Sequence, residues 1–337
     1  MNPVISAKNV WKMFGPEPER YLKSMPEGHS FEDIRADGYI AGVKDVSFDV
    51  SKGEMLVIMG LSGSGKSTLV RCFSRLHDIT GGSIEVDGQD IMSLKESELI
   101  ELRRSKMGMV FQSFGLLPHR TVLQNVAFPL EMRGQDKHST RERAMEVVRL
   151  VGLEGREDYF PRELSGGQQQ RVGIARSLAI EPDIWFLDEP FSALDPLIRR
   201  EMQDEFLRLQ DMLDKTIVFI THDFDEALRL ADRITIMKDG AVEQIDTPDQ
   251  IVLNPATEYV AKFTEDVDKA RVVHASGLVV DGSVGEGEPV AADTTIQSLA
   301  RRLIDETAEI IPVKMPDGNV KGMPRKAALD VLLGEAR

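Results

Sequence analysis

The amino-acid sequence predicts an α/β fold built on a parallel sheet, with an inserted helical subdomain and a small second domain. Three observations predict this fold. Apolar runs at residues 55–59, 184–187 and 216–221 lack polar alternation, which is typical of strands covered on both faces. Helical patterns separate these runs, as in strand–helix–strand units. The 337 residues also exceed what one hydrophobic core usually organises.

The N-terminal segment is expected to contribute two strands separated by a polar insertion. Residues 4–14 are expected to form an edge strand, and residues 43–50 the next strand. The insertion, residues 15–42, contains Ser30 and Asp33 in the S-x-x-D pattern of a helix capping box. We therefore expect a short helix inside the insertion.

A glycine-rich loop follows the strand at 55–59 and fits the pattern G-x-x-x-x-G-K-[ST], with a helix expected at 67–76. Glycines let backbone N–H groups turn toward a phosphate, and the helix N-terminus adds partial positive charge. Lys66 can reach the β- and γ-phosphates, and the Ser67 hydroxyl can bind Mg²⁺. For the loop alone, the alternative is a flexible glycine turn. The residues expected to hold ATP here are Gly60, Leu61, Ser62, Gly63, Ser64, Gly65, Lys66, Ser67 and Thr68.

Two carboxylates, Asp188 and Glu189, follow the apolar strand at 184–187. They stand at the C-terminal edge of the predicted sheet, where α/β folds bind ligands. Asp188 is expected to help hold Mg²⁺, and Glu189 is expected to be the catalytic base that polarises the attacking water. Without a phosphate loop, such a pair would more often begin a helix.

A helical subdomain is expected over about residues 113–180, because residues 121–153 carry only helical patterns. One apolar stripe with helical spacing comprises Ala144, Val147, Val148 and Val151. After it, an amphipathic helix is expected over 198–213, and a further strand over 234–237.

The composition shifts after residue 264, so residues 1–264 and 265–337 are expected to form separate domains. Glycines punctuate the first part of the second domain. A helix at 295–307, a strand at 309–314, a turn at 316–318 and a closing helix are then expected.

Composition and charge exclude some classes of function and location. The net charge of −15 opposes attraction to nucleic acid, so no nucleic-acid partner is expected. No apolar run reaches the roughly 18 residues that span a bilayer, and the N-terminus lacks a signal-peptide pattern. We therefore expect a cytosolic chain. Cys72, the single cysteine, lies in an apolar helical stretch and is expected in the core.

The segment from Leu164 to Gln168, Leu-Ser-Gly-Gly-Gln, resembles the signature of ATP-binding cassette (ABC) proteins. Further motifs follow in that family's order: Gln112 matches the Q-loop glutamine, Asp195 ends a D-loop, and His222 matches the switch histidine. Phe14 stands where the family places an aromatic residue that stacks on adenine. The resemblance covers about residues 4–263 and implies an ATPase that uses ATP and Mg²⁺.

The resemblance also implies roles for these residues. Lys66 and His222 would be catalytic together with Glu189, and Gln112 would contact both ATP and Mg²⁺. Two copies would form a head-to-tail homodimer, in which each copy completes the ATP site of the other. The residues implied to act in trans are Ser165, Gly166, Gly167, Gln168 and Asp195.

The apolar segment from Gln112 to Leu123 is expected to form a groove between the core and the helical subdomain. We expect this groove to receive a short helix of an integral membrane permease, the alternative being an ordinary hydrophobic joint. The chain would then lie peripherally at the cytoplasmic face of the plasma membrane.

Within the family, the sequence most resembles the ATPase subunits of glycine betaine, choline and proline betaine importers. The insertion at 15–42, the run around the phosphate loop and the segment 191–200 carry this resemblance. It implies an energy-coupling ATPase for a quaternary amine or a related amino acid such as histidine, with a separate solute-binding protein as indirect partner. The alternatives are a soluble cassette ATPase unconnected with transport and a module that uses ATP only as a regulatory ligand.

Residues 275–337 resemble one cystathionine-β-synthase (CBS)-type motif, carried by the segments 289–295 and 310–313 and by Gly322. In related importers, paired motifs of this kind sense ionic strength or adenine-containing ligands. Only one motif fits the available length, and the segment after Gly322 lacks the Ser/Thr-x-x-Asp that usually grips a ribose. We therefore expect dimerisation or docking here rather than nucleotide sensing.

Overall fold

The computed structural model describes residues 3–110, 115–192, 194–213, 215–280, 282 and 284–334. The chain divides into two compact units, which are described separately. The first unit spans Met1–Glu226 and Met237–Val242, and the second spans Ala227–Ile236 and Glu243–Arg337.

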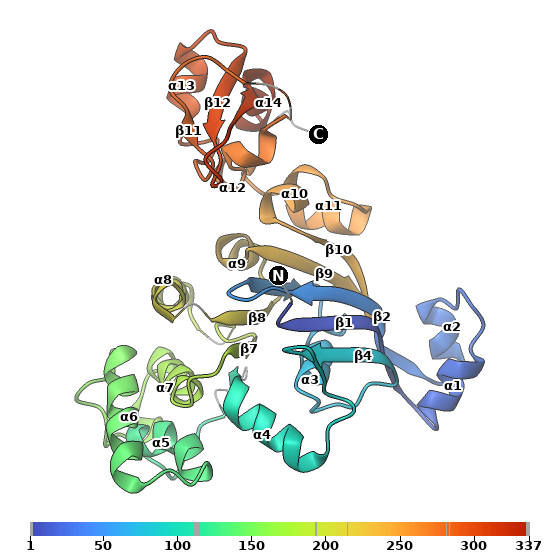
Figure 1. The fold of residues 1–337 in the computed structure, drawn as a ribbon, viewed down its shortest axis with the longest axis vertical. Coiled ribbons are helices and arrows are strands. Elements are labelled where there is room, and N and C mark those ends of the chain that lie inside the picture. The colour runs from blue at the N-terminus through green and yellow to red at the C-terminus, as the bar shows by residue number, and fades with distance from the viewer. Residues whose placement is uncertain are drawn as a thin grey trace. The chain divides into compact units, whose positions relative to one another are not determined.

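The first unit contains an antiparallel sheet in the order β2-β1-β4-β5 (Figure 1). Its strands are β1 (Ile5–Phe14), β2 (Ile40–Val50), β4 (Gly81–Val86) and β5 (Gln89–Asp90). Ile5 is opposite Val50 of β2 on one side and Val86 of β4 on the other, so the prediction of an edge strand at 4–14 is wrong. β4 escapes sequence-based prediction because two glycines open it and only two of its six residues, Ile84 and Val86, are buried apolar side chains.

The insertion carries two helices, α1 (Pro18–Ser24) and α2 (Phe31–Ala36), where one was expected (Figure 1). The predicted capping box is confirmed. The Ser30 hydroxyl accepts a hydrogen bond from the Asp33 N–H, and the Asp33 carboxylate accepts one from the Ser30 N–H. Ile34 of α2 is buried against Met13 and Ala41. This packing fixes the insertion against the ends of β1 and β2.

A second sheet runs in the order β10-β9-β3-β8-β7-β6. Its parallel strands are β3 (Met55–Met59), β8 (Thr216–Thr221), β7 (Ile184–Asp188) and β6 (Met107–Val110). Every residue of β3, β7 and β8 is buried, which confirms the predicted cover on both faces. The hairpin of β9 (Arg233–Lys238) and β10 (Ala241–Asp246) completes the order. Parallel strands end at one edge of a sheet, so the segments that follow β3, β7 and β8 emerge together.

Four helices adjoin these strands in the chain. α3 (Lys66–Phe73) follows β3, and α4 (Glu96–Lys106) precedes β6. α8 (Pro196–Leu213) connects β7 to β8, and α9 (Phe224–Leu230) connects β8 to β9. Trp185 and Phe219 pack on Phe206 of α8, with ring centroids 5.7 and 6.0 Å apart. Cys72 is buried in α3, as predicted. Across the part of the chain that the structure describes, no helix has the length and apolarity to cross a membrane.

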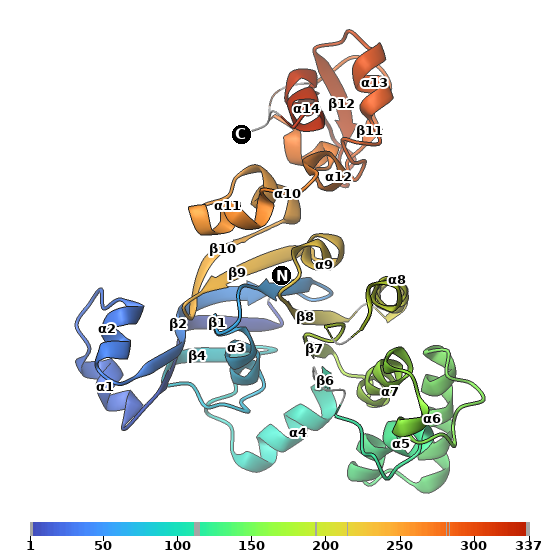
Figure 2. The same ribbon diagram turned by 180° about the vertical axis from the view of Figure 1, so that it is seen from behind.

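The helical part of the first unit contains α5 (Val122–Met132), α6 (Lys137–Leu150) and α7 (Gly166–Leu178) (Figure 2). A short 3₁₀ helix, Pro161–Glu163, precedes α7. The predicted apolar stripe is confirmed, since Ala144, Val147 and Val148 of α6 are fully buried. α7 packs against both α5 and α6, so its start is positioned by the core of the helical part.

After β10, the second unit continues with α10 (Pro248–Leu253), α11 (Glu258–Thr264), α12 (Lys269–Val272) and a 3₁₀ helix, Ala275–Leu278. It ends with β11 (Val290–Ala291), α13 (Ala300–Asp305), β12 (Ile310–Lys314), β13 (Val320–Pro324) and α14 (Arg325–Leu332), and its sheet has the order β11-β12-β13. The strand at 309–314 and the turn after it match expectation. The helix expected at 295–307 begins only at Ala300, because Thr295 forms a β-bridge with His274.

Candidate functional site

The glycine-rich loop lies between β3 and α3, and two of its glycines have no substitute. Gly60 has φ +146°, and a Cβ there would lie 2.2 Å from the Met237 carbonyl oxygen. Gly65 has φ +102°, and its Cβ would lie 2.2 Å from the Gly42 oxygen. Left-handed backbone and close approach both require glycine. The loop is therefore held in one tight curve at the start of α3.

Lys66, the first residue of α3, is 5% exposed. Its Nζ donates hydrogen bonds to the carbonyl oxygens of Gly60 and Leu61, at 2.8 and 3.0 Å. Burial lowers the pKa of this ammonium, and the negative charges of Glu189 and Asp188 oppose that shift. An anion placed in the loop would offer this buried cation a stronger partner than neutral carbonyls.

Ser67 and Asp188 join the loop to the end of β7. The Ser67 hydroxyl donates a hydrogen bond to Asp188 Oδ1 at 2.9 Å. Asp188 is 7% exposed, and burial raises its pKa, while the Ser67 hydroxyl and the charge of Arg71 act in the opposite direction. The two side chains thus place a hydroxyl and a carboxylate oxygen together, which are hard oxygen ligands of the kind that Mg²⁺ prefers.

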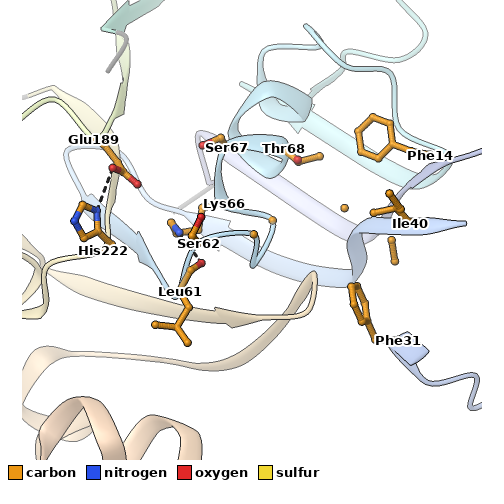
Figure 3. Close-up of a pocket in the computed structure, with 14 residues that line it drawn as sticks. Phe14, Phe31, Ile40, Leu61, Ser62, Lys66, Ser67, Thr68, Glu189 and His222 are labelled. Atoms are coloured by element: carbon orange, nitrogen blue, oxygen red, sulfur yellow. Dashed lines mark hydrogen bonds and ion pairs between the residues drawn. The ribbon is translucent and has the colours of Figure 1, made fainter. Parts of the chain in front are cut away.

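Glu189 and His222 form a second polar pair. Glu189 has φ +46°, in the left-handed region, and its backbone N–H donates to the Ile220 oxygen of β8 at 3.0 Å. Its Oε2 lies 3.1 Å from Nδ1 of His222, which directly follows β8 (Figure 3). The strained backbone turns the carboxylate toward the histidine at the edge of the sheet.

Lys66, Ser67, Glu189 and His222 line one cavity of about 670 Å³. Figure 3 shows Phe14, Phe31 and Ile40 grouped at one end of it, with Glu189 and His222 at the other. We call Phe14, Phe31, Ile40, Ala41 and Gly42 the apolar end, and Ser62, Lys66, Ser67, Thr68, Glu189 and His222 the polar end. Leu61, Gly63 and Gly65 also line the cavity. The cavity therefore suits a ligand that is anionic at one end and apolar at the other.

Ten of the predicted site residues line this cavity, and so do four residues that were not predicted: Phe31, Ile40, Ala41 and Gly42. Phe14 lies at the apolar end as expected. None of the four was predicted, because all lie within the insertion at 15–42, which matches no motif. The one available signal was that Phe31 directly follows the capping serine of a predicted helix.

The signature residues lie elsewhere in the first unit. Ser165 is the N-cap of α7, where its hydroxyl accepts from the Gln168 N–H at 3.3 Å. Asp195 accepts a hydrogen bond from the Ile198 N–H at the start of α8. Neither the predicted trans set, Ser165 to Gln168, nor Asp195 is among the described residues that line the cavity. Gln112, expected to bind ATP and Mg²⁺, lies outside the described residues.

Comparison with known proteins identifies relatives of this arrangement. The sequence model described as "ABC transporter" matches residues 43–192. The trimethylamine N-oxide transport system ATP-binding protein TmoW of Ruegeria pomeroyi is 77% identical over 98% of each chain. The glycine betaine transport ATP-binding protein OpuAA of Bacillus subtilis is 51% identical over 82% of this chain and 66% of its own length.

Among solved structures, the dimeric post-hydrolysis state of the ATP-binding cassette MJ0796, bound to ADP and Pi, matches with a TM-score of 0.61. It is 35% identical and covers 72% of this chain and 98% of its own. Sequence, fold and cavity thus agree. The chain belongs to the ABC transporter family, as an ATP-binding subunit.

Proposed function

We propose that this chain hydrolyses ATP to drive import of a small methylated amine through a membrane permease, and that trimethylamine N-oxide is the solute. The observation that carries the choice of solute is the 77% identity to a trimethylamine N-oxide transport protein over 98% of both chains. That alignment takes in nearly all of residues 265–337. The glycine betaine relative is 51% identical and aligns with 82% of this chain.

In the proposed reaction the triphosphate lies along the glycine-rich loop. Lys66 exchanges its hydrogen bonds to the Gly60 and Leu61 carbonyls for phosphate oxygens. The exchange is favourable because a bond between two charged groups is roughly twice as strong as one to a neutral acceptor. The loop's backbone N–H groups and the α3 N-terminus add to the attraction.

The 2.9 Å pair of Ser67 and Asp188 fits Mg²⁺, which these two residues would hold. Among the described residues, no group of three His, Cys, Asp or Glu side chains is suited to hold a metal by itself. Phosphate oxygens of the substrate would therefore complete the ligand set. When bound, Mg²⁺ neutralises charge on the β- and γ-phosphates.

Glu189 is the proposed catalytic base, which orients and polarises the attacking water. His222 holds this carboxylate through the 3.1 Å contact between Nδ1 and Oε2, and it lies where the γ-phosphate would end. A base held by a second side chain retains the geometry that in-line attack needs.

We propose that a second copy supplies Ser165, Gly166, Gly167, Gln168 and Asp195 to the γ-phosphate in a head-to-tail homodimer. Two observations support this proposal. The residues at the N-terminus of α7 are not among the described residues that line the cavity of their own chain, so its helix dipole is left for another ligand-bearing surface. A 35% identical relative forms a dimer after hydrolysis. Closure of such a dimer would transmit the energy of ATP to the permease.

A separate cavity of about 350 Å³ supports a permease contact. It lies between β6, the segment after Gly115, and helices α5 and α7, with Leu117, Phe128 and Pro129 in its wall. An apolar groove of this kind fits a short helix. The chain would then work peripherally, at the cytoplasmic face of the membrane, with a solute-binding protein as indirect partner.

For residues 265–337 we propose dimerisation or docking. A cavity of about 560 Å³ in this unit is lined by Glu286, Glu288, Asp305 and Glu306, and Arg302 is the one basic residue among the described residues of its lining. Four carboxylates repel the phosphates of a nucleotide. The acidic lining therefore disfavours binding of a nucleotide in this cavity, and with it the nucleotide sensing that paired CBS-type motifs perform.

The test is transport by the reconstituted complex of this chain, its permease and its solute-binding protein. Trimethylamine N-oxide, glycine betaine, choline and histidine would each be offered as labelled solute with ATP inside the vesicle. We expect ATP-dependent uptake of trimethylamine N-oxide at the highest kcat/KM, and none with Lys66→Ala. Preferred uptake of another of these solutes would overturn the assignment of the solute, and phosphate release without any uptake would overturn the transport function.

A further inference from the structure

Three different elements build the apolar end of the proposed ATP cavity. Phe14 is the last residue of β1, and Ile40, its register partner, is the first residue of β2. Phe31 is the first residue of α2, inside the insertion. Figure 3 shows the ring of Phe31 on the opposite side of Ile40 from the ring of Phe14. The insertion therefore takes part in the cavity wall.

This end exposes apolar surface that a flat ligand could cover. Phe14 is 38% exposed and Ile40 is 59% exposed. Gly42 keeps the space beside Phe14 clear, since a Cβ there would lie 2.7 Å from the Phe14 ring and 3.0 Å from the Thr68 methyl carbon. Because covering apolar surface is favourable, an aromatic ring placed here would be stabilised.

Phe31 is held in place by the packing of the insertion. Ile34, one turn further along α2, is fully buried against Met13 and Ala41. Lys44 Nζ donates to the His29 carbonyl at 2.8 Å, just before the capping serine. The ring of Phe31 packs against the same cluster. A wall fixed in this way before the ligand arrives loses little entropy on binding.

We propose that Phe31 is a second base-binding residue, which faces the nucleotide base from the insertion while Phe14 faces it from the sheet. This inference rests on the proposed function, because it assumes that the triphosphate lies at the polar end. No residue of the apolar end carries a side-chain hydrogen-bond donor or acceptor. The base is therefore recognised through its ring faces, and adenine and guanine should depend on Phe31 equally.

The test is isothermal titration of the full-length chain with Mg²⁺ and a non-hydrolysable ATP analogue, the matching GTP analogue, or inorganic tripolyphosphate. Tripolyphosphate fills the polar end and has no base. Phe31→Ala should raise the Kd of both nucleotide analogues by roughly tenfold, as loss of one stacking contact does. The Kd of tripolyphosphate should stay within about twofold, because the polar end is unchanged.

The matched control is Met25→Ala. Met25 packs against the same buried cluster as Phe31 but is not among the described residues that line the cavity. It should leave all three Kd values within about twofold. Phe31→Trp keeps an aromatic face, so it should retain nucleotide affinity, and its fluorescence should change with the nucleotide analogues and not with tripolyphosphate.

An unchanged nucleotide Kd in Phe31→Ala would overturn the inference. Equal losses in Phe31→Ala and Met25→Ala, or equal losses for nucleotide and tripolyphosphate, would assign Phe31 a purely structural role. A loss for one nucleotide alone would show recognition of the base edge. If Phe31→Ala does not fold, Phe31→Trp decides through its fluorescence. A native chain that binds neither nucleotide would instead overturn the proposed function.

Discussion

The two ends of the 670 Å³ cavity are built from different kinds of sequence. The polar end comes from one continuous loop and from residues that directly follow buried strands, and Lys66 is almost completely buried there. The apolar end comes from strand ends and from an insertion, and Phe14 and Ile40 remain partly exposed. The proposed chemistry is thus assigned to the more buried end, whereas the proposed contact with the base lies at the more exposed end.

This difference has an energetic consequence. At the polar end a lost partner leaves a buried charge behind, which costs several kcal/mol. At the apolar end a lost side chain reduces a stacking contact that costs roughly 1–3 kcal/mol. Substitutions at the polar end should therefore abolish function, and those at the apolar end should tune affinity.

The largest effect is expected for Lys66→Ala. The substitution removes the one lysine of the loop, whose Nζ lies within 3.0 Å of two loop carbonyls. Kd for the ATP analogue and for tripolyphosphate should both rise at least about a hundredfold, since each loses a charged hydrogen-bond donor. Isothermal titration measures both. A Kd within tenfold of the native value would contradict the expectation that substitutions at the polar end have larger effects than those at the apolar end.

The next effect is expected for Glu189→Gln. The amide keeps the size of the side chain but cannot accept a proton from water, so phosphate release should fall by about 10² to 10⁴-fold. Binding of the ATP analogue should stay within about threefold, because Glu189 is not assigned to hold the phosphates. His222→Ala serves as comparison, and it should lower phosphate release less than Glu189→Gln does. Full turnover by Glu189→Gln would remove Glu189 from its assigned role.

The polar end of the cavity could be predicted from the sequence, whereas much of the apolar end could not. The loop at 60–68 could be predicted because its residues are contiguous and its glycines are required by the backbone, as the Gly65 approach to Gly42 shows. Asp188 and His222 could be predicted because each follows a run without polar alternation, which is buried throughout in the structure. Phe31 could not, because its place in the cavity depends on tertiary packing of Ile34 against β1 and β2.

The errors have the same cause. β1 was predicted at the edge of a sheet, whereas it lies between β2 and β4, and β4 has a weak local pattern. The helix expected from 295 begins at Ala300, because a bridge between Thr295 and His274 occupies its first residues. In both cases a contact distant in sequence decided the structure over local propensity.

A smaller effect is expected for Gly42→Ala, which acts mainly on the apolar end. The new Cβ would lie 2.7 Å from the Phe14 ring, so the ring must rotate away from its present position. The Kd of the ATP analogue should rise by about three- to tenfold, while the Kd of tripolyphosphate should not change. If both ligands lose affinity equally, the substitution has disturbed the loop, and the two ends are coupled rather than separate.

The smallest effect is expected for Tyr21→Phe, which acts on the insertion at a distance from the cavity. Tyr21 stacks on Tyr39, with ring centroids 3.8 Å apart, and its hydroxyl donates to Asp37 Oδ2 at 2.7 Å. The stack survives the substitution. Nucleotide Kd should therefore stay within about twofold, and only the stability of the chain should fall slightly.

The pH dependence of that stability sharpens this last prediction. Burial, the hydrogen bond to Asp37 and the charge of that carboxylate raise the pKa of Tyr21 from 10.0 to about 12. A raised pKa favours the neutral phenol, so its contribution to stability is complete below pH 10 and is lost as the pH rises toward 12. Urea denaturation of the native chain and Tyr21→Phe, compared at pH 9, 10.5 and 11.5, should show a difference that shrinks with pH. A constant difference would mean that the phenol does not ionise with the expected linkage, and Tyr39→Phe provides the control for the loss of a neighbouring hydroxyl.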